Sequence, residues 1–278
     1  MASITDCVVE GLKYPFNDIK KLLGAGVLFA IISVLSTFIG FKSVHIFRMS
    51  VNLVENTNGT ISQIPFSQLP AGDIYLLIGL SILSIIVGLF ILGYQYDVLK
   101  FSIDKKADLP GFSDIVGLFG RGIKYFIVSL AYSIIPIMVL ILGVTVVGNS
   151  SVFMIVSLIV ILLLIIAYFL LIMALNNMVA YDNIKKAFDF REITDNIANL
   201  GWGKYIGIVL FTIIIMMIIS VAVSFILGFI TVGFAAVINN QAIIISFVIA
   251  IIEGLFVDSY MTVFFSRVCG SIYRESIK

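Results

Sequence analysis

Six long runs of apolar residues dominate the chain, and short polar segments separate them. The runs cover residues 22–41, 74–93, 123–147, 152–175, 204–227 and 242–265. A helix needs roughly 20 apolar residues to cross about 30 Å of hydrocarbon, and each run is long enough to do so. In lipid a segment must satisfy its own backbone hydrogen bonds, so the runs are predicted to be helices despite their many β-branched residues. The pattern predicts an all-α fold, a polytopic membrane bundle of six transmembrane helices forming a single integral membrane domain over residues 1–278.

The end of the fifth run is ambiguous because residues 228–238 remain apolar. One interpretation is a single strongly tilted helix that projects from the bilayer. The other is a break at Gly228 and Gly233 that leaves a short piece lying in the interface.

Composition supports the membrane interpretation and limits the possible partners. Hydrophobic residues make up 61% of the chain and charged residues only 12%, with a mean hydropathy of +1.17, so most of the chain must be solvated by a lipid bilayer. The formal net charge of +1 provides no basic field for nucleic acid. Two distant cysteines, Cys7 and Cys269, and the single His45 predict no metal site, no cofactor and no disulfide framework.

The positions of the basic residues predict the orientation of the chain. With the N-terminus in the cytoplasm, 15 of the 17 lysines and arginines fall on the cytoplasmic side, and only Lys42 and Arg48 fall outside. The positive-inside rule therefore favours a multi-pass protein of the cell membrane with both termini cytoplasmic, N-in and C-in. Residues 42–73 then form an extracytoplasmic loop.

Three similar segments precede the first, third and fifth runs, all on the predicted cytoplasmic side. Each has a phenylalanine, an acid two residues later, then an isoleucine, and each ends in Gly-x-Gly. The members are Phe16, Asp18 and Ile19; Phe112, Asp114 and Ile115; and Phe190, Glu192 and Ile193. The spacing predicts amphipathic helices lying in the headgroup layer, with the glycines allowing a sharp turn into the bilayer.

These segments suggest an internal repeat of an interfacial helix plus a two-helix hairpin, used three times. The repeats would cover about residues 12–100, 108–180 and 187–275. Short Phe and Ile patterns before membrane spans also recur by chance, and repetition alone does not distinguish a transporter from an inert scaffold.

Several short motifs resemble a known family. They are "KYPFNDIKKLLGAG", "LGY" at Leu92 to Tyr94, "DLPGFSDIVGLFGRGIK" and "MALNNMVAYDNIKKAFDFREI". Together they resemble a family of uncharacterised polytopic membrane proteins, a domain of unknown function found in archaea, especially methanogens, and in some bacteria. The resemblance implies a prokaryotic cell membrane location and supplies no activity, ligand or catalytic residue.

Two acids in the sixth run are the candidate site, because acids within membrane spans are costly and are functional hypotheses by default. Glu253 is expected near the middle of the bilayer and Asp258 nearer the cytoplasmic side. In one interpretation Glu253 is a proton or cation site facing a cavity, with Asp258 and Arg267 on the exit path. In the other, a protonated Glu253 bonds to a buried hydroxyl of Tyr132, Ser220 or Ser224, and Asp258 pairs with a basic residue.

The chain lacks the usual signatures of catalysis, with no Walker-type loop, no H-E-x-x-H motif and no carboxylate pair beside a nucleophile. An enzyme is therefore not expected, and no catalytic residue is assigned. The favoured function is a non-enzymatic, membrane-embedded scaffold or assembly module that associates with itself or with other membrane proteins. The alternative is a small ion- or proton-coupled transporter or channel that uses Glu253.

Overall fold

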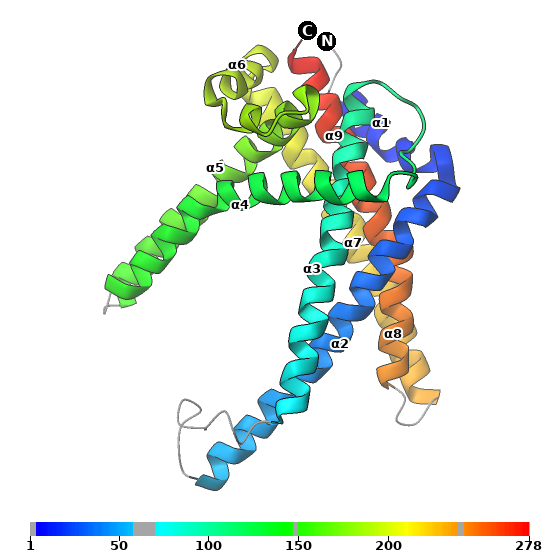
Figure 1. Ribbon diagram of the computed structural model, residues 1–278, viewed down its shortest axis with the longest axis vertical. Helices are drawn as coiled ribbons and strands as arrows, with labels where there is room; N and C mark the ends of the chain where they lie inside the picture. The colour runs from blue at the N-terminus through cyan, green and yellow to red at the C-terminus, as the bar shows by residue number, and fades with distance from the viewer. Residues whose placement is uncertain (1–3, 58–69, 147–149, 238–241, 278) are drawn as a thin grey trace. The chain divides into compact units, whose positions relative to one another are not determined.

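The computed structural model describes residues 4–57, 70–146, 150–237 and 242–277, and this part of the chain is all-helical (Figure 1). The elements, in chain order, are α1 (Ile4–Lys13), the 3₁₀ helix η1 (Tyr14–Asp18), α2 (Ile19–Thr57), α3 (Ala71–Ile103), α4 (Ile115–Val146), α5 (Ser150–Tyr181), the 3₁₀ helix η4 (Ile184–Phe188), α6 (Phe190–Leu200), α7 (Trp202–Val237), α8 (Ala242–Ile252), the π-helix η5 (Glu253–Asp258) and α9 (Ser259–Ser276).

Within the described residues, six helical segments are long and apolar enough to cross a membrane, and each covers most or all of one apolar run. The prediction of six long apolar helices is thus confirmed, and the chain is a multi-pass membrane protein by length and composition.

The helices extend beyond the apolar runs. Residues 42–57, which the sequence placed in a loop, continue α2 to Thr57, while residues 58–69 of that loop lie outside the described residues. Helix α7 runs without interruption through Gly228 and Gly233 to Val237, so the fifth run is one long helix.

The chain divides into two compact units. Unit 1 comprises Met1–Leu22, Leu92–Ile219 and Tyr260–Lys278, and unit 2 comprises Leu23–Ile91 and Ser220–Ser259. Because four helical segments pass from one unit into the other, each unit is assembled from parts that are distant in sequence.

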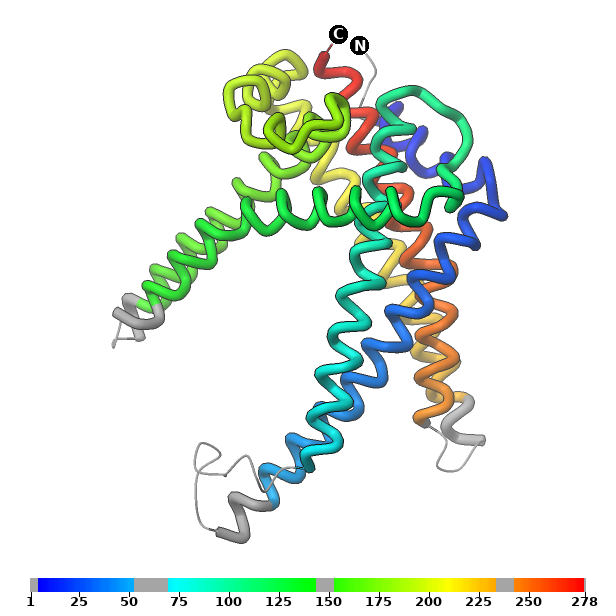
Figure 2. Tube along the Cα trace, viewed as in Figure 1, coloured from blue at the N-terminus to red at the C-terminus, as the bar shows by residue number. Residues whose placement is uncertain are grey.

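In unit 1, α4 and α5 form an antiparallel hairpin, and the turns of η4 and α6 follow the end of α5 (Figure 2). Helix α1 packs on α9, since a Cβ added at Gly11 would lie 2.4 Å from a methyl carbon of Val268. Helices α3 and α4 touch through their backbones, because a Cβ at Gly93 would lie 2.0 Å from the carbonyl oxygen of Leu118.

In unit 2, the buried side chains of Phe29 on α2 and of Val87 and Ile91 on α3 form a small hydrophobic core. At the other face of α2, the glycines Gly26 and Gly254 bring its backbone against η5. Small residues of this kind allow membrane helices to approach closely.

The three similar segments adopt different structures. Phe16 and Asp18 lie in the 3₁₀ helix η1. Residues 111–114 form a bend without a helix of their own, and only the third segment forms a separate helix, α6. Helices α2 and α4 run straight through Gly24, Gly26, Gly120 and Gly122, so those glycines make no turn. The turn occurs only at Gly201, where φ is +92°.

The acids of the first two segments cap helices. The Asp18 carboxylate accepts a hydrogen bond from the amide of Lys21 (3.1 Å), and the Asp114 carboxylate accepts one from the amide of Gly117 (2.9 Å). Each acid therefore occupies the N-cap position and ends the preceding segment. In the third segment the cap of α6 is Asp189, and Glu192 lies within the first turn.

Candidate functional site

Glu253 and Asp258 are the first and last residues of a π-helical turn, η5. The flanking residues Ile252 and Ser259 have ordinary helical dihedral angles, so η5 is an insertion within one continuous helix that includes α8 and α9. Such insertions are rare and often occur at functional sites. This makes the two predicted acids part of an unusual backbone segment.

Ser33 on α2 is the hydrogen-bond partner of Asp258. The Ser33 hydroxyl donates to the Asp258 carboxylate at 3.3 Å. No partner of the Glu253 carboxylate is found among the residues that the structure describes. The prediction that Asp258 pairs with a basic residue is not supported within this part of the chain.

Helix α2 holds η5 by direct backbone contact. A Cβ added at Gly26 would lie 2.3 Å from the carbonyl oxygen of Leu255, and one added at Gly254 would lie 2.5 Å from Cα of Ala30. Ser33 follows Ala30 by about one turn, so the close contact brings its hydroxyl within reach of Asp258.

A cavity of about 600 Å³ lies between α2 and α8 in the same unit. Its polar lining comes from Thr37, His45, Arg48 and Ser246. Thr37 is one helical turn from Ser33, and its hydroxyl donates to the Ser33 carbonyl at 2.8 Å. Polar groups therefore extend along one face of α2 from this cavity to Asp258.

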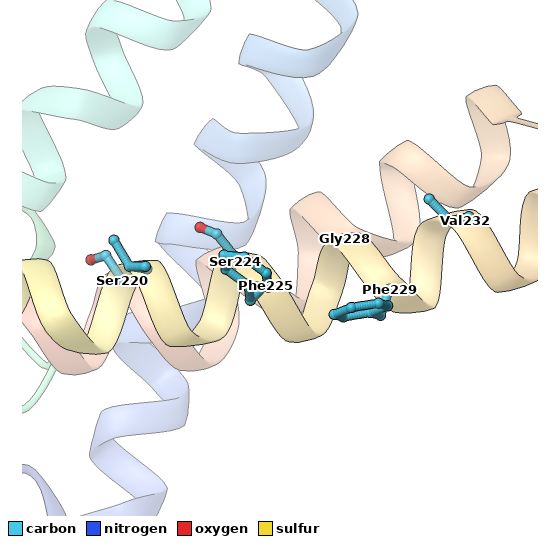
Figure 3. Close-up of a pocket in the computed structure, with 7 residues that line it drawn as sticks. Ser220, Ser224, Phe225, Gly228, Phe229 and Val232 are labelled. Atoms are coloured by element: carbon cyan, nitrogen blue, oxygen red, sulfur yellow. The ribbon is translucent and has the colours of Figure 1, made fainter.

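Three hydroxyl groups were predicted from the sequence as hydrogen-bond partners of Glu253, but they lie in other surroundings. The Tyr132 hydroxyl donates to the carbonyl of Ala187 at 2.7 Å. Ser220 and Ser224 line a groove of about 640 Å³ along α7, together with Phe225 and Phe229 (Figure 3). This groove is otherwise apolar and has no cluster of groups capable of catalysis.

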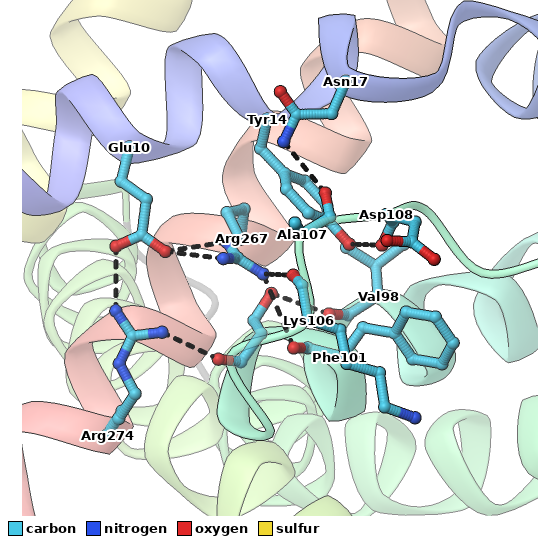
Figure 4. Close-up of polar contacts among 11 residues, drawn as sticks. Glu10, Tyr14, Asn17, Val98, Phe101, Lys106, Ala107, Asp108, Arg267 and Arg274 are labelled. Atoms are coloured by element: carbon cyan, nitrogen blue, oxygen red, sulfur yellow. Dashed lines mark hydrogen bonds and ion pairs between the residues drawn. The ribbon is translucent and has the colours of Figure 1, made fainter.

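A second polar cluster lies in unit 1, around Arg267 (Figure 4). The Arg267 side chain is only 7% exposed, and its guanidinium lies 2.7 Å from the Glu10 carboxylate. It also donates to the carbonyl of Lys106 (2.8 Å) and lies over the Tyr14 ring at 4.1 Å. Arg274 donates to the same carboxylate at 2.8 Å.

This cluster joins three parts of the chain, because Glu10 belongs to α1, Lys106 to the loop after α3, and both arginines to α9. One of the two interpretations of the sequence placed Arg267 on an exit path for ions. The structure instead uses its charge in an internal ion pair.

The loop before α6 is held by similar contacts. Asp182 accepts hydrogen bonds from the Tyr96 hydroxyl (2.7 Å) and from Lys124 (3.0 Å), and these bonds lower the pKa of its carboxyl group. The Asp189 carboxylate caps α6 and pairs with Lys186, and its pKa is lowered mainly by the amide of Glu192. These acids are therefore structural anions.

The predicted residues of the three segments contact different partners. Each phenylalanine lies against a tyrosine: Phe16 against Tyr260 (centroids 5.4 Å apart), Phe112 against Tyr94 (5.0 Å), and Phe190 against Tyr132 (6.0 Å).

The other members differ more. Ile19 and Ile115 are exposed, whereas Ile193 is fully buried on the inner face of α6 and Glu192 pairs with Lys186. The nine residues therefore do not form one site.

Sequence reasoning missed Ser33 and Glu10. Ser33 is separated from Asp258 by 225 residues, and one serine in an apolar run is no signal by itself. Glu10 could have been suspected, because a carboxylate beside a membrane span near buried arginines needs a partner. Among the described residues, no group of three or more His, Cys, Asp or Glu side chains could hold a metal ion.

Comparison with known proteins places the chain in a family. Residues 76–228, more than half of the chain, match the model of DUF4013, a protein family of unknown function. The chain belongs to this family. An uncharacterized protein of Methanocaldococcus jannaschii, MJ1189, is 24% identical to this DUF4013 chain over 295 aligned residues, covering 97% of the chain and 95% of the relative. The resemblance to a methanogen membrane family is thus confirmed, and no solved structure matches the chain significantly.

Proposed function

We propose that this chain is a non-enzymatic scaffold of the prokaryotic cell membrane, with six spans and with both termini in the cytoplasm. Its partners would be the bilayer and a second copy of the chain or another membrane protein. The observation that carries the proposal is the use of charged side chains for internal support. Arg267, Arg274 and Glu10 join α1 to α9, and Lys124 and Asp182 join α4 to the loop after α5.

The division of charge supports the proposed orientation. Unit 1 contains 15 of the 17 lysines and arginines, whereas unit 2 contains only Lys42 and Arg48. Exposed apolar side chains adjoin the polar segments of unit 1, such as Phe16, Val116 and Phe190. Such residues suit the headgroup layer, which supports an interfacial position for these segments.

A second candidate function, proton or cation transport, is favoured by η5. Its acids lie in a π-helical turn, one of them bonds to Ser33, and a polar cavity begins about one turn farther along α2 at Thr37. On this arrangement Asp258 is the better candidate for the transported charge, because it has a hydroxyl partner on the route to the cavity. Glu253 would then act as a neighbouring acid.

Flux measurements in reconstituted vesicles separate the two functions. The scaffold proposal predicts that vesicles containing the wild-type protein, loaded with a pH-sensitive dye and given a potassium diffusion potential, acidify no faster than empty vesicles. The same absence is expected for Asp258→Asn, Glu253→Gln and the control Asp104→Asn, whose side chain is exposed in a loop of unit 1.

Transport would be indicated by rapid wild-type flux that Asp258→Asn reduces at least tenfold while Asp104→Asn leaves it unchanged. That result would overturn the scaffold proposal. Wild-type flux that neither Asp258→Asn nor Glu253→Gln changes would overturn both the scaffold proposal and the proposed role of η5 in transport.

A further inference from the structure

A crevice of about 230 Å³ lies in unit 1 between α4, α5 and the start of α6. Its walls come from the two helices of the hairpin and from two phenylalanines beside Asp189. The lining includes Ala131, Tyr132 and Pro136 on α4, Ala167 on α5, and Phe188 and Phe190. Apart from the Tyr132 hydroxyl these side chains are apolar, and those on α4 and α5 lie within candidate membrane spans. In a bilayer, the acyl chains of the surrounding lipids would therefore lie next to this crevice.

Local sequence explains why the crevice is open. Pro136 has no N–H group and so leaves the carbonyl of Tyr132 without its helical donor, and α4 changes direction partway along its length (Figure 2). Ala131 and Ala167 provide short side chains on the two facing helices. At the far end of the hairpin the helices close again, because a Cβ at Gly143 would lie 2.2 Å from a methyl carbon of Val156.

Aromatic rings bound the crevice at the end nearest α6. The Tyr132 ring lies 6.1 Å from the Phe188 ring and 6.0 Å from the Phe190 ring. Its hydroxyl is bound to the carbonyl of Ala187. The apolar space thus ends where the polar segment of η4 and α6 begins. A phospholipid has the same order, because its apolar acyl chain ends at a polar headgroup.

Two basic residues lie close to the two phenylalanines in the sequence. Lys185 lies on η4 and Arg191 follows Phe190, and both are exposed. Neither makes an ion pair with a residue that the structure describes, although Asp195 lies one turn along α6 from Arg191. Two other lysines in this region are already in ion pairs. Lys186 pairs with Asp189 and Glu192, and Lys124 pairs with Asp182. Positive charge is therefore available at the aromatic end of the crevice.

We propose that the crevice binds one anionic phospholipid of the surrounding membrane. One acyl chain lies between α4 and α5, and the phosphate headgroup lies against Arg191 and Lys185. This site does not depend on whether the chain is a scaffold or a transporter, since it uses neither η5 nor the Arg267 cluster.

The test is lipid retention measured by native mass spectrometry. Protein is extracted with mild detergent from vesicles containing equal amounts of phosphatidylglycerol and phosphatidylcholine. Wild type is expected to retain one phosphatidylglycerol in preference to phosphatidylcholine. Because each basic side chain near the surface contributes about 1 kcal/mol, the double variant Arg191→Gln/Lys185→Gln should lower this preference about 30-fold.

Matched variants distinguish the crevice from general surface attraction. Lys13→Gln/Lys20→Gln removes two exposed charges from another part of unit 1 and should leave the preference unchanged. Ala167→Phe fills the crevice and should reduce retention of both lipids. If Ala167→Phe does not fold, comparison of the two double variants still tests whether Arg191 and Lys185 bind the headgroup.

Any one of four results would overturn the proposal. The first is equal retention of the two lipids by wild type. The second is an equal loss of preference in both double variants, which would indicate general electrostatic attraction. The third is a folded Ala167→Phe protein that still retains the lipid. The fourth is a stable lipid-free dimer whose interface covers the hairpin.

Discussion

A single carboxylate, that of Glu10, forms ion pairs with two arginines of α9. Arg267 is 7% exposed and Arg274 is 14% exposed at the side chain, so neither cation is well solvated by water. The remaining donors of Arg267 reach the carbonyl of Lys106, and Arg274 reaches that of Ser102 (3.0 Å). Removing the carboxylate charge would leave two cations in an environment that requires an anion.

Glu10→Gln is therefore expected to destabilise the protein. Loss of one partner of a buried ion pair costs about 3–5 kcal/mol, and the partial exposure of Glu10 reduces the expected cost to about 2–3 kcal/mol. Thermal unfolding in detergent, followed by circular dichroism, should show a clear decrease in the midpoint. The exposed acid Asp104 is the control, and an equal decrease in Asp104→Asn would contradict this account of the cluster.

At the residue scale the sequence identified unusual groups but not their partners. The cost of an acid in lipid pointed to Glu253 and Asp258 without any structure. Their inclusion in a π-helical turn and the hydrogen bond from Ser33 depend on how η5 packs against Gly26 and Ala30. Such long-range contacts have no local signal in the sequence.

At the element scale, three similar segments use the same residue types for different purposes. Asp18 and Asp114 cap α2 and α4 directly, so these helices begin at the next residue. In the third segment Asp189 caps α6, and the chain turns at Gly201 before α7. The similarity of the segments suggested one structure, but capping allows a short acidic motif to start either a short helix or a long one.

The glycines show the same dependence on context. Gly26 and Gly93 lie inside long helices, where they permit backbone contact, and among the glycines that the structure describes only Gly201 has a positive φ. The amide of Gly201 donates to the carbonyls of Ile197 and Ala198 and so ends α6. A Gly-x-Gly pattern alone cannot distinguish a contact glycine from a turn glycine, because the difference lies in the backbone angle φ and in what packs against the glycine.

Substitution of Gly201 tests this assignment. Gly201→Ala should lower stability by about 1–3 kcal/mol, because alanine rarely adopts a φ of this sign, even though no atom lies within 4 Å of the added Cβ. Gly203→Ala, also in open space but inside α7, should instead raise stability by about 0.5–1 kcal/mol. Thermal unfolding of the two variants should shift in opposite directions, and a parallel shift would disprove the turn assignment.

At the scale of the whole molecule, hydrophobic length was enough to predict six helices, because lipid leaves the backbone few alternatives. The division into two units could not be predicted in this way, since it depends on which parts of the long helices contact each other. The charges nevertheless follow this division, and all but two of the basic residues belong to unit 1. The orientation proposed for the chain rests on this asymmetry.

The most direct test is the sidedness of single cysteines introduced into a chain whose own Cys7 and Cys269 are replaced by alanine. Asp104→Cys and Asp195→Cys lie in polar segments of unit 1. In unit 2, Arg48→Cys lies on α2 and Gly72→Cys at the start of α3, both in the part of the chain proposed to be extracytoplasmic. With a membrane-impermeant maleimide, the first pair should be labelled only in inside-out vesicles and the second pair only in intact cells. Labelling of Asp104→Cys and Asp195→Cys from opposite sides, or of all four positions from one side, would contradict the six-span, N-in and C-in arrangement.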